Sequence, residues 1–404
     1  MATIARSFLE AIPKTDVHVH LDGSLRLATL IELAREQKIN LPSFTEAGLK
    51  ELIFKERYRD LPEYLAGFQY TVAVMQTSEA IERIAFELAE DNFNEGVCYV
   101  EPRFAPQLHI NSKLNAQEVL AAVDRGLERA EKDLNARKEV KVGQRPPFAY
   151  GIIGCALRMF TPQFSHYYQT LATLHSKMPE VERFSLASLE LVRELVAARE
   201  EKGVAVVGFD LAGAEKGYPA EDHRKAYDLA HRHFLKKTVH AGEAYGPPSI
   251  FQAITDCHAD RIGHGTNLFD ETLVDLPDPA ARSRYVGALA QYIADQRITI
   301  ELCLTSNLQT IPSMTLAKHP FGKMLESKLS TTFCTDNRLV SHTTVTNEIA
   351  MAVETFQIGP ARLKDLIIYG FKRSFYPGGY IDKRKYVRKV IDTYERLEKE
   401  YKIM

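Results

Sequence analysis

TDVHVHL, at residues 15–21, is the stretch of sequence that decides the fold. Valine and histidine alternate along it, which predicts a short strand with Val17 and Val19 on one face and His18 and His20 on the other. An open, doubly wound sheet would be expected to place a glycine-rich phosphate-binding turn after its first strand. Here the strand ends in His-x-His-Leu-Asp-Gly instead, which favours a different parallel architecture.

Seven more runs of this kind follow, separated by longer stretches with apolar residues at three- and four-residue spacing, which are typical of amphipathic helices. Alternating strands and helices predict a parallel sheet, and eight such units predict that the sheet closes into a (β/α)8 barrel. After the first strand, the predicted strands are residues 97–104, 148–155, 204–212, 237–242, 260–265, 298–303 and 331–336.

Two segments look inserted into this pattern. They are residues 162–184 and residues 270–284, the second of which is rich in proline, aspartate and alanine. Neither has the composition of a linker between domains, and the length of the chain is common for one α/β barrel with insertions. Residues 1–404 are therefore predicted to form one barrel domain with inserted helical segments.

The composition of the 404-residue chain excludes several classes of protein. Hydrophobic residues make up 45% and charged residues 26%, the net charge is −2, and no basic stripe indicates a nucleic-acid partner. No apolar run approaches the roughly 18 residues of a membrane span, and the N-terminus lacks the apolar core of a signal peptide. Five scattered cysteines without a Cys-x-x-Cys pair favour a reducing compartment. We expect a cytoplasmic protein with no membrane partner.

Polar residues cluster at the last positions of the predicted strands. In a (β/α)8 barrel the catalytic residues lie at the C-terminal ends of the strands, which converge on one mouth. The candidates at these positions are His18, His20, Asp210, His240, His264 and Asp336. Their placement predicts an active site at that mouth.

Three of these histidines and one aspartate form a candidate metal site. His18 and His20 share one face of the first strand, His240 ends the fifth strand and Asp336 ends the eighth. Zinc accepts imidazole nitrogen and carboxylate oxygen, and a catalytic zinc site keeps one position open for water. Taken singly, each residue is more often structural than a ligand. A second His-x-His pair, at residues 231–233, lies in a predicted helix, where residues two apart do not face together.

Glu243 and His264 are candidates for proton transfer. Glu243 follows His240 in HAGE and would lie beside the metal without binding it, where a carboxyl group can shuttle protons. The competing explanation is a glutamate at a helix start, which the helix dipole favours. His264 ends RIGHG and is either a general base that orients hydroxide or a polar residue that fills the barrel mouth.

Five short motifs stand out along residues 13–350. They are HVHLDGSLR (18–26), FDLAGAE (209–215), HAGE (240–243), RIGHGT (261–266) and TDN (335–337). In this order and at this spacing they resemble the adenosine deaminase family, although no single motif is specific. The resemblance implies zinc-dependent hydrolytic deamination of adenosine, and of 2′-deoxyadenosine, to inosine and ammonia. Its small-molecule partner would be a purine nucleoside.

The resemblance also implies a role for each residue that matches a family motif. The ligands of one Zn²⁺ would be His18, His20, His240 and Asp336. Zinc lowers the pKa of water to about 7 and so supplies hydroxide, which Asp336 would align and His264 would orient. Glu243 would protonate ring nitrogen 1 of the purine. The backbone of Gly213 would donate to ring nitrogen 3, and Asp22 would hold the ribose hydroxyls.

LPEYLAGFQY (61–70) resembles the apolar gate helix of the family. The residues that would face the pocket are Leu61, Tyr64, Leu65 and Phe68. Ordinary core packing also produces an apolar stripe on a helix, so both interpretations stay open at this point.

Asn337 departs from the common family pattern, which has a second aspartate after the metal-binding one. This residue would face ring nitrogen 7, which only accepts hydrogen bonds. An amide donates as it stands, whereas a carboxylic acid must first be protonated. Asparagine is therefore chemically suited, and we expect Asn337 to contact the substrate.

Other reactions stand as alternatives. The nearest is deamination of another 6-aminopurine, namely adenine, methylthioadenosine or aminodeoxyfutalosine. Relatives that act on adenine tend to carry Glu or Asn at the position of Asp22, so HLDG favours a nucleoside. A different metal-dependent hydrolase often uses two metals bridged by a carboxylated lysine, and no lysine ends the predicted third or fourth strand. The sequence predicts no particular oligomeric state.

Overall fold

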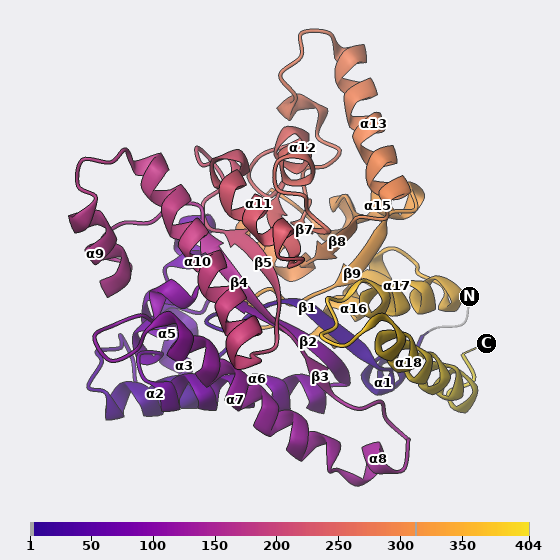
Figure 1. Ribbon diagram of the computed structural model, residues 1–404. Helices are drawn as coiled ribbons and strands as arrows, with labels where there is room; N and C mark the ends of the chain where they lie inside the picture. The colour runs from indigo at the N-terminus through magenta and orange to yellow at the C-terminus, as the bar shows by residue number, and fades with distance from the viewer. Residues whose placement is uncertain (1–3, 312, 404) are drawn as a thin grey trace.

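Eight parallel strands form the centre of the computed structural model, which describes residues 4–311 and 313–403 (Figure 1). Their order around the sheet follows their order in the chain, which confirms the predicted (β/α)8 fold. The strands are β1 (Lys14–His20), β2 (Val97–Phe104), β4 (Ile152–Leu157), β5 (Val206–Ala212), β6 (Lys236–Ala241), β7 (Arg261–His264), β8 (Thr299–Leu302) and β9 (Ser330–Phe333). A short β3 (Ala149–Tyr150) pairs with β2 and is the first part of the third predicted strand.

The first and last strands meet at the seam of the barrel without a regular ladder. Their contact is a parallel bridge between Val19 and Asp336. The His20 N–H donates to the Asp336 carbonyl at 2.6 Å, and the Asp336 N–H donates to the His18 carbonyl at 2.8 Å. The barrel is therefore nearly closed, and its seam brings Asp336 beside the two histidines of β1.

The strands are buried along almost their whole length. Every residue of β2 and β5 is buried, as is typical of parallel strands that are covered by helices outside and by packed side chains inside. Val17 and Val19 belong to the main hydrophobic core. Because side chains alternate along a strand, His18 and His20 take the opposite face of β1, as predicted from their spacing.

Helices surround the barrel on all sides (Figure 1). Among them, α7 begins with a capping box, in which the side chains of Asn115 and Glu118 each accept from the other residue's backbone N–H. The helices are α1 (Arg6–Ala11), α2 (Leu27–Glu36), α3 (Glu46–Leu52), α4 (Leu61–Leu65), α5 (Phe68–Val74), α6 (Ser78–Asn94), α7 (Ala116–Asn135), α8 (Lys138–Lys141), α9 (His166–Leu174), α10 (Glu180–Lys202), α11 (Arg224–Arg232), α12 (Pro247–Thr255), α13 (Pro279–Gln296), α14 (Leu304–Thr310), α15 (Phe321–Glu326), α16 (Val345–Thr355), α17 (Pro360–Arg373) and α18 (Tyr380–Glu400).

The two segments that look inserted in the sequence lie at the edges of the molecule. Residues 162–184 form α9 and the start of α10, and they contribute to a second hydrophobic cluster apart from the main core. Residues 270–284 form a 3₁₀ turn (Glu271–Leu273) and the start of α13, which projects away from the barrel (Figure 1).

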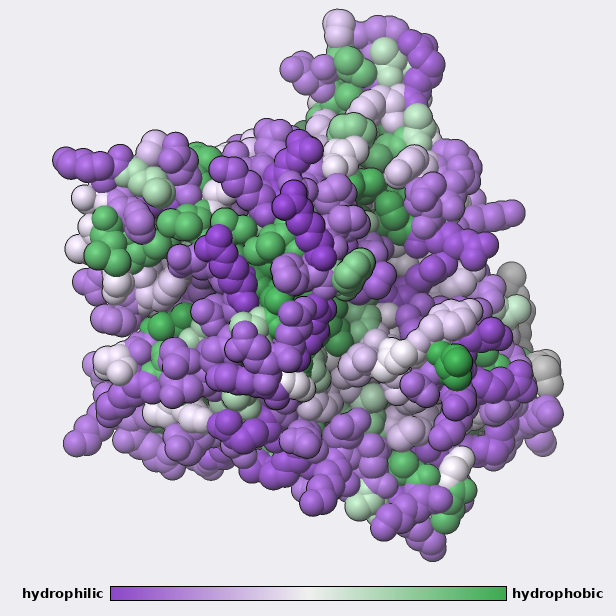
Figure 2. Space-filling view, viewed as in Figure 1, coloured by the Kyte–Doolittle hydropathy of each residue, from purple (hydrophilic) through white to green (hydrophobic). Residues whose placement is uncertain are grey.

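The surface in the same view is mostly hydrophilic, with hydrophobic side chains showing in hollows between helices (Figure 2). Within residues 4–311 and 313–403, none of the helices combines the length and the apolar composition that a membrane span requires. All five cysteines are buried and free of disulfides.

Candidate active site

Four side chains from three strand ends meet at the mouth of the barrel. They are His18, His20, His240 and Asp336, and each offers a ligand atom within 4.8 Å of the others. The Nε2 atoms of His20 and His240 lie 3.2 Å apart, and Oδ1 of Asp336 lies 3.4 Å from Nε2 of both His18 and His20. The four residues predicted as ligands therefore form one metal-binding cluster.

The hydrogen bonds of the cluster show that it suits a cation. Nδ1 of His18 donates to Glu301 at 2.7 Å, so its Nε2 presents a lone pair, and this buried atom has no hydrogen-bond partner among the described residues. Burial holds the pKa of His20 well below its usual range, despite the opposing charge of Asp336. Neutral imidazoles would thus turn lone pairs toward one another, an arrangement that a metal ion stabilises.

A buried ion network behind the cluster fixes two of the histidines. Nδ1 of His240 lies 3.0 Å from the carboxylate of Asp210, and Arg103 bonds to Asp210 at 2.7 Å and to Glu301 at 2.9 Å. Burial alone would raise the pKa of Asp210 and Glu301, but the neighbouring positive charges hold both well below the usual range. Both carboxylates are therefore ionised and set the ring orientation of the histidines.

Asp336 and His264 are held in an unusual backbone conformation. Their φ angles are 60° and 65°, in the left-handed region that residues other than glycine seldom adopt. Such strain is of the order of 1–3 kcal/mol per residue and concentrates at functional sites. Oδ2 of Asp336 accepts from the Ser306 hydroxyl at 2.6 Å, so Oδ1 alone faces the histidines.

Two residues behind His264 select the tautomer of its ring. The Phe321 N–H donates to Nδ1 of His319 at 3.1 Å, so the proton of neutral His319 is on Nε2, which bonds to Oδ1 of Asn307 at 3.2 Å. Burial lowers the pKa of His319 to about 4, which keeps the ring neutral. The Asn307 amide in turn donates to Nδ1 of His264 at 3.1 Å. Neutral His264 therefore carries its proton on Nε2, the nitrogen left for the cavity.

Glu243 lies in the loop between β6 and α12, and Glu215 holds that loop. The carboxylate of Glu215 accepts from the backbone N–H groups of residues 242, 243, 244 and 245 at 2.8, 3.1, 2.6 and 2.8 Å. It also accepts from the Ser249 hydroxyl, and its side chain is buried. Glu243 is thus placed by a neighbouring anion, and it does not start a helix, because α12 begins at Pro247.

Replacing Glu215 by glutamine is expected to lower kcat on the order of a hundredfold. The amide group removes one acceptor oxygen, leaves buried N–H groups unpaired and shifts the loop that carries Glu243, and displacements of about 1 Å at a reacting group can cost this much. Steady-state kinetics would measure the effect. Exposed Glu221 supplies the matched control, because Glu221→Gln should leave kcat unchanged. A full-rate Glu215→Gln enzyme would show that the loop keeps its position without this carboxylate.

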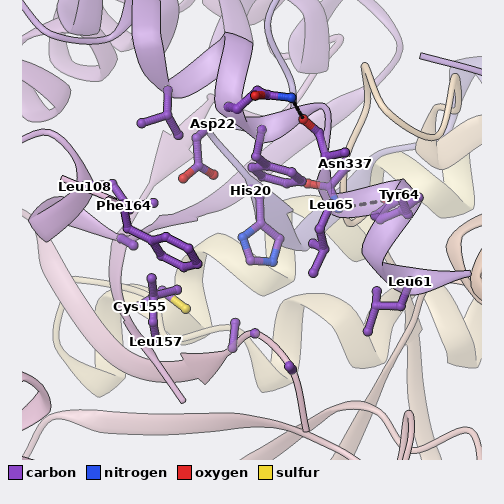
Figure 3. A pocket seen from close by; sticks show the side chains of 18 of the residues that line it. His20, Asp22, Leu61, Tyr64, Leu65, Leu108, Cys155, Leu157, Phe164 and Asn337 are labelled. Atoms are coloured by element: carbon purple, nitrogen blue, oxygen red, sulfur yellow. Dashed lines mark hydrogen bonds between the residues drawn. The ribbon is translucent and has the colours of Figure 1, made fainter. Parts of the chain in front are cut away.

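The cluster opens into a cavity of about 750 Å³ that gathers most of the predicted site residues (Figure 3). His18 lies beneath its floor and is fully buried. The predicted residues that line the cavity are His20, Asp22, Leu61, Tyr64, Leu65, Phe68, Gly213, His240, Glu243, His264, Asp336 and Asn337. The second His-x-His pair lies outside this site, with His231 exposed on α11.

The predicted gate segment is two short helices, α4 and α5, that meet at Ala66 and Gly67. Leu61, Tyr64, Leu65 and Phe68 all line the cavity, and the Tyr64 side chain is almost fully buried. The Tyr64 hydroxyl pairs with the Ser341 hydroxyl at 2.8 Å and lies 3.5 Å from Oδ2 of Asp336. α4 is therefore attached to the metal cluster through a polar contact as well as apolar packing.

Asn337 and Gly23 fit against each other at the cavity wall. The Asn337 amide nitrogen donates to the Tyr64 hydroxyl at 2.8 Å (Figure 3), while its Oδ1 is buried and has no partner among the described residues. A Cβ atom at position 23 would lie 1.8 Å from that oxygen. The glycine of HLDG is thus required by the close approach of Asn337.

Asp22 and Gly213 present polar groups to the same cavity. Oδ1 of Asp22 is buried without a hydrogen-bond partner among the described residues, and burial raises the pKa of this carboxyl to about 7. Gly213 has a φ of 97°, which favours glycine and turns the chain at the end of β5. Both groups lie where a ligand with hydroxyl and ring-nitrogen atoms would satisfy them.

Over residues 13–394 the chain matches the profile of the family described as adenosine deaminase. The chain belongs to the adenosine deaminase family. Among curated relatives, the adenosine deaminase of Mycobacteroides abscessus is 37% identical over 369 residues, which are 90% of this chain and 91% of that protein. The family predicted from the five motifs is confirmed.

Two solved structures with the fold of this adenosine deaminase family member are less similar in sequence. The adenine deaminase of Arthrobacter aurescens superposes with a TM-score of 0.74 at 21% identity, covering 95% of this chain and 99% of that one. The N6-methyl-AMP deaminase of Arabidopsis thaliana has a TM-score of 0.71 at 24% identity and covers 96% and 98%. At these identities the likeness establishes the barrel fold alone.

Several residues that support the adenosine deaminase site were not predicted from the sequence. They are Arg103, Glu215, Glu301, Ser306, Asn307 and His319. A signal existed for two of them, because Arg103 and Glu301 are charged residues inside predicted buried strands, and such charges are rarely buried without partners. Nothing in the pattern around Glu215 or Asn307 indicates which distant group each contacts.

Proposed function

We propose that the protein hydrolyses the 6-amino group of adenosine, and of 2′-deoxyadenosine, to give inosine and ammonia. One observation carries the proposal: residues of the metal cluster, Glu243, His264 and Asp22 all border one cavity. A metal, an acid, an orienting base and a ribose contact are the parts that this reaction needs. The printed name of the Mycobacteroides abscessus relative supports the same substrate.

One zinc ion is the proposed cofactor. Three imidazoles and one carboxylate are a donor set that zinc favours. His18, His20, His240 and Asp336 would hold the ion, because their ligand atoms lie within 4.8 Å of one another and three of the separations are 3.2, 3.4 and 3.4 Å. When bound, zinc lowers the pKa of water to about 7 and supplies hydroxide at neutral pH.

The side chains around the cavity would perform the remaining steps. Glu243 donates a proton to ring nitrogen 1, so negative charge does not accumulate on the purine while oxygen adds to carbon 6. His264 directs its Nε2–H toward the attacking oxygen, since Nδ1 is occupied by Asn307. The hydroxyl proton on carbon 6 then passes to the amino nitrogen, the carbon 6–nitrogen bond breaks, ammonia leaves, and the purine becomes hypoxanthine.

Three groups would position the nucleoside. The Asp22 carboxyl group binds ribose hydroxyls, and the Gly213 N–H donates to ring nitrogen 3, since both residues line the cavity. Asn337 makes one hydrogen bond through Nδ2 within the described residues, so the second hydrogen on that atom is available to ring nitrogen 7. α4 and α5 would cover the bound nucleoside.

The proposal also includes a single barrel domain and a cytoplasmic location. The five cysteines, which are free of disulfides, support the cytoplasmic location.

Replacing Asn337 by leucine is expected to lower kcat/KM for adenosine by at least about tenfold. Leucine keeps the approximate volume of the side chain but donates no hydrogen bond, and tenfold corresponds to about 1.4 kcal/mol. Initial rates over a range of adenosine concentrations would measure the effect, with thermal unfolding to verify that the variant is folded. An unchanged kcat/KM would remove Asn337 from the substrate contacts.

The proposed reaction is tested by incubating the zinc-loaded protein with adenosine and following the absorbance change as adenine becomes hypoxanthine. Adenine is measured in parallel, because deamination of the free base is an alternative. Rapid turnover of adenosine with release of one ammonia per nucleoside is the expected result. Turnover of adenine alone would show that adenine, and not adenosine, is the substrate. No turnover of either compound with zinc bound would exclude deamination of both.

A further inference from the structure

The cavity continues beyond the groups that would bind a nucleoside. Its volume of about 750 Å³ lies in the upper part of the range of roughly 300–1,000 Å³ that is usual for sites of drug-sized ligands. Its lining includes the apolar side chains of Val72, Leu108, Met159 and Phe164, which we call the apolar chamber, and the polar residues Gln69, Gln76, Gln163 and Ser165 also line the cavity. In Figure 3, Asp22, Leu108 and Phe164 lie together on one side of His20, whereas the gate residues Leu61 and Leu65 lie on the other.

A hydrogen bond holds the shape of the apolar chamber beside Asp22. Ala105 lines the cavity together with Asp22 and directly precedes the 3₁₀ turn Pro106–Leu108. The Ser165 hydroxyl donates to the carbonyl of Gln107 at 2.7 Å, so the segment that carries Phe164 is fixed to that turn. The chamber is thus continuous with the ribose side of the site.

The segment at residues 162–184 supports this wall. Its α9 and the start of α10 supply most of the second hydrophobic cluster, whose buried members are Phe160, Tyr168, Leu171, Phe184 and Ala187. Leu108 and Met159 pack against that cluster on one side and line the cavity on the other. The inserted segment therefore builds one side of the substrate cavity.

The charge around the cavity excludes a phosphate group. Among the described residues that line it there is no lysine or arginine, and the carboxyl groups are those of Asp22, Glu243 and Asp336. A phosphate on the ribose would lie beside Asp22 without a cation to balance it, and uncompensated charges are costly to bury. The amide of Gln76, a polar group near Leu108, is already bonded to the carbonyls of Val72 and Leu108 at 2.8 and 3.3 Å.

The exposure of Phe164 indicates what would fill the chamber. Its side chain lines the cavity and is 43% exposed. Covering an aromatic ring with an apolar group is favourable because it removes apolar surface from water. A hydroxyl group alone, as in adenosine, would not cover it.

We propose that the apolar chamber binds an uncharged, apolar substituent on carbon 5′ of the ribose, so that 5′-alkyl and 5′-alkylthio adenosines are substrates beside adenosine. The inference rests on the proposed function, since the metal cluster fixes the purine end and Asp22 the ribose end. The reaction itself is unchanged: water adds at carbon 6, the bond to the amino nitrogen breaks, and one ammonia is released without oxidation or reduction.

The test compares kcat/KM for adenosine, 5′-methylthioadenosine and AMP with the zinc-loaded enzyme. The kcat/KM for 5′-methylthioadenosine is expected to equal or exceed that for adenosine, because an apolar group in a fitted pocket contributes about tenfold or more. AMP is expected to react at least about a hundredfold less efficiently. Turnover of adenosine with no turnover of 5′-methylthioadenosine would overturn the chamber but leave the proposed function intact, whereas turnover of neither nucleoside would overturn the proposed function.

Substitutions in the apolar chamber test whether the 5′ substituent binds there. Phe164→Ser should lower the ratio of kcat/KM for 5′-methylthioadenosine to that for adenosine by about tenfold, and its partial exposure means that folding does not depend on it. Met159→Ser is the second chamber variant. Leu174→Ser, on α9 but 74% exposed and outside the cavity, is the matched control and should leave both rates unchanged. A ratio that neither chamber variant alters, or efficient turnover of AMP, would contradict the proposal.

Discussion

Glu243→Gln is expected to lower kcat for adenosine about a thousandfold while the enzyme keeps its metal. Positioned acids contribute roughly 10²- to 10⁴-fold to proton transfer, and a glutamine amide has no proton to give to ring nitrogen 1. The backbone N–H groups of residues 243, 244 and 245 donate to Glu215 at 3.1, 2.6 and 2.8 Å. These bonds do not involve the Glu243 side chain, so the substitution should leave the loop in place and change only the chemistry of that side chain. The substitution tests the acid itself.

Two measurements separate this effect from a loss of structure. Metal analysis should find the same zinc content in the variant, because Glu243 is not part of the metal cluster. Glu271→Gln, at an exposed glutamate in the turn before α13, is the matched control and should retain full activity. A Glu243→Gln enzyme with more than about a tenth of the original kcat would assign the proton transfer to another group.

The barrel could be predicted because its signals are local. Each predicted run coincides with an observed strand, since parallel strands buried on both faces are short apolar stretches separated by amphipathic helices. The strand boundaries in the structure differ from the predicted ones where they depend on tertiary contacts. The third strand is interrupted after Tyr150 and continues to Leu157, and the eighth ends at Phe333, before Asp336. The bridge that carries Asp336 to β1 follows from closure of the barrel and has no counterpart in the local sequence.

The metal cluster could be predicted for a related reason, since strand ends in this fold converge on one mouth. The supporting residues could not, because their partners are distant in the chain. Arg103 meets Asp210 and Glu301, which are 107 and 198 residues away. A charged residue in a buried strand signals that such a partner exists, but only the three-dimensional arrangement identifies it.

The gate segment illustrates a second limit of sequence patterns. The apolar stripe at residues 61–70 allowed either a gate or a core helix, and the structure has features of both. Leu61 and Leu65 line the cavity, and Tyr64 lines it too but is buried and bonded to Ser341. A tyrosine counts as apolar in a periodicity argument, so the pattern cannot reveal the hydroxyl contact that ties α4 to the metal cluster.

Removal of the proposed metal ligand His240 is expected to have the other large effect. His240→Ala should lower kcat at least about a thousandfold, lose most of the bound zinc and unfold at a lower temperature. The imidazole supplies one of four ligand atoms, and its loss also leaves Asp210 without the ring that it orients. Elemental analysis, steady-state kinetics and thermal unfolding measure the three consequences. His231→Ala, at an exposed histidine on α11, is the matched control and should change none of them.

Removing the metal from the wild-type protein with a chelator tests the role of the metal without a mutation. The Nε2 atoms of His20 and His240 lie 3.2 Å apart, and the buried Nε2 of His18 has no hydrogen-bond partner among the described residues, so a bound ion is expected to stabilise the fold. We expect the chelated enzyme to lose activity and melt earlier, and added zinc to restore both. Full turnover after chelation, with no zinc detected, would mean that the nucleophile is generated without a metal, and the cluster would then need another explanation.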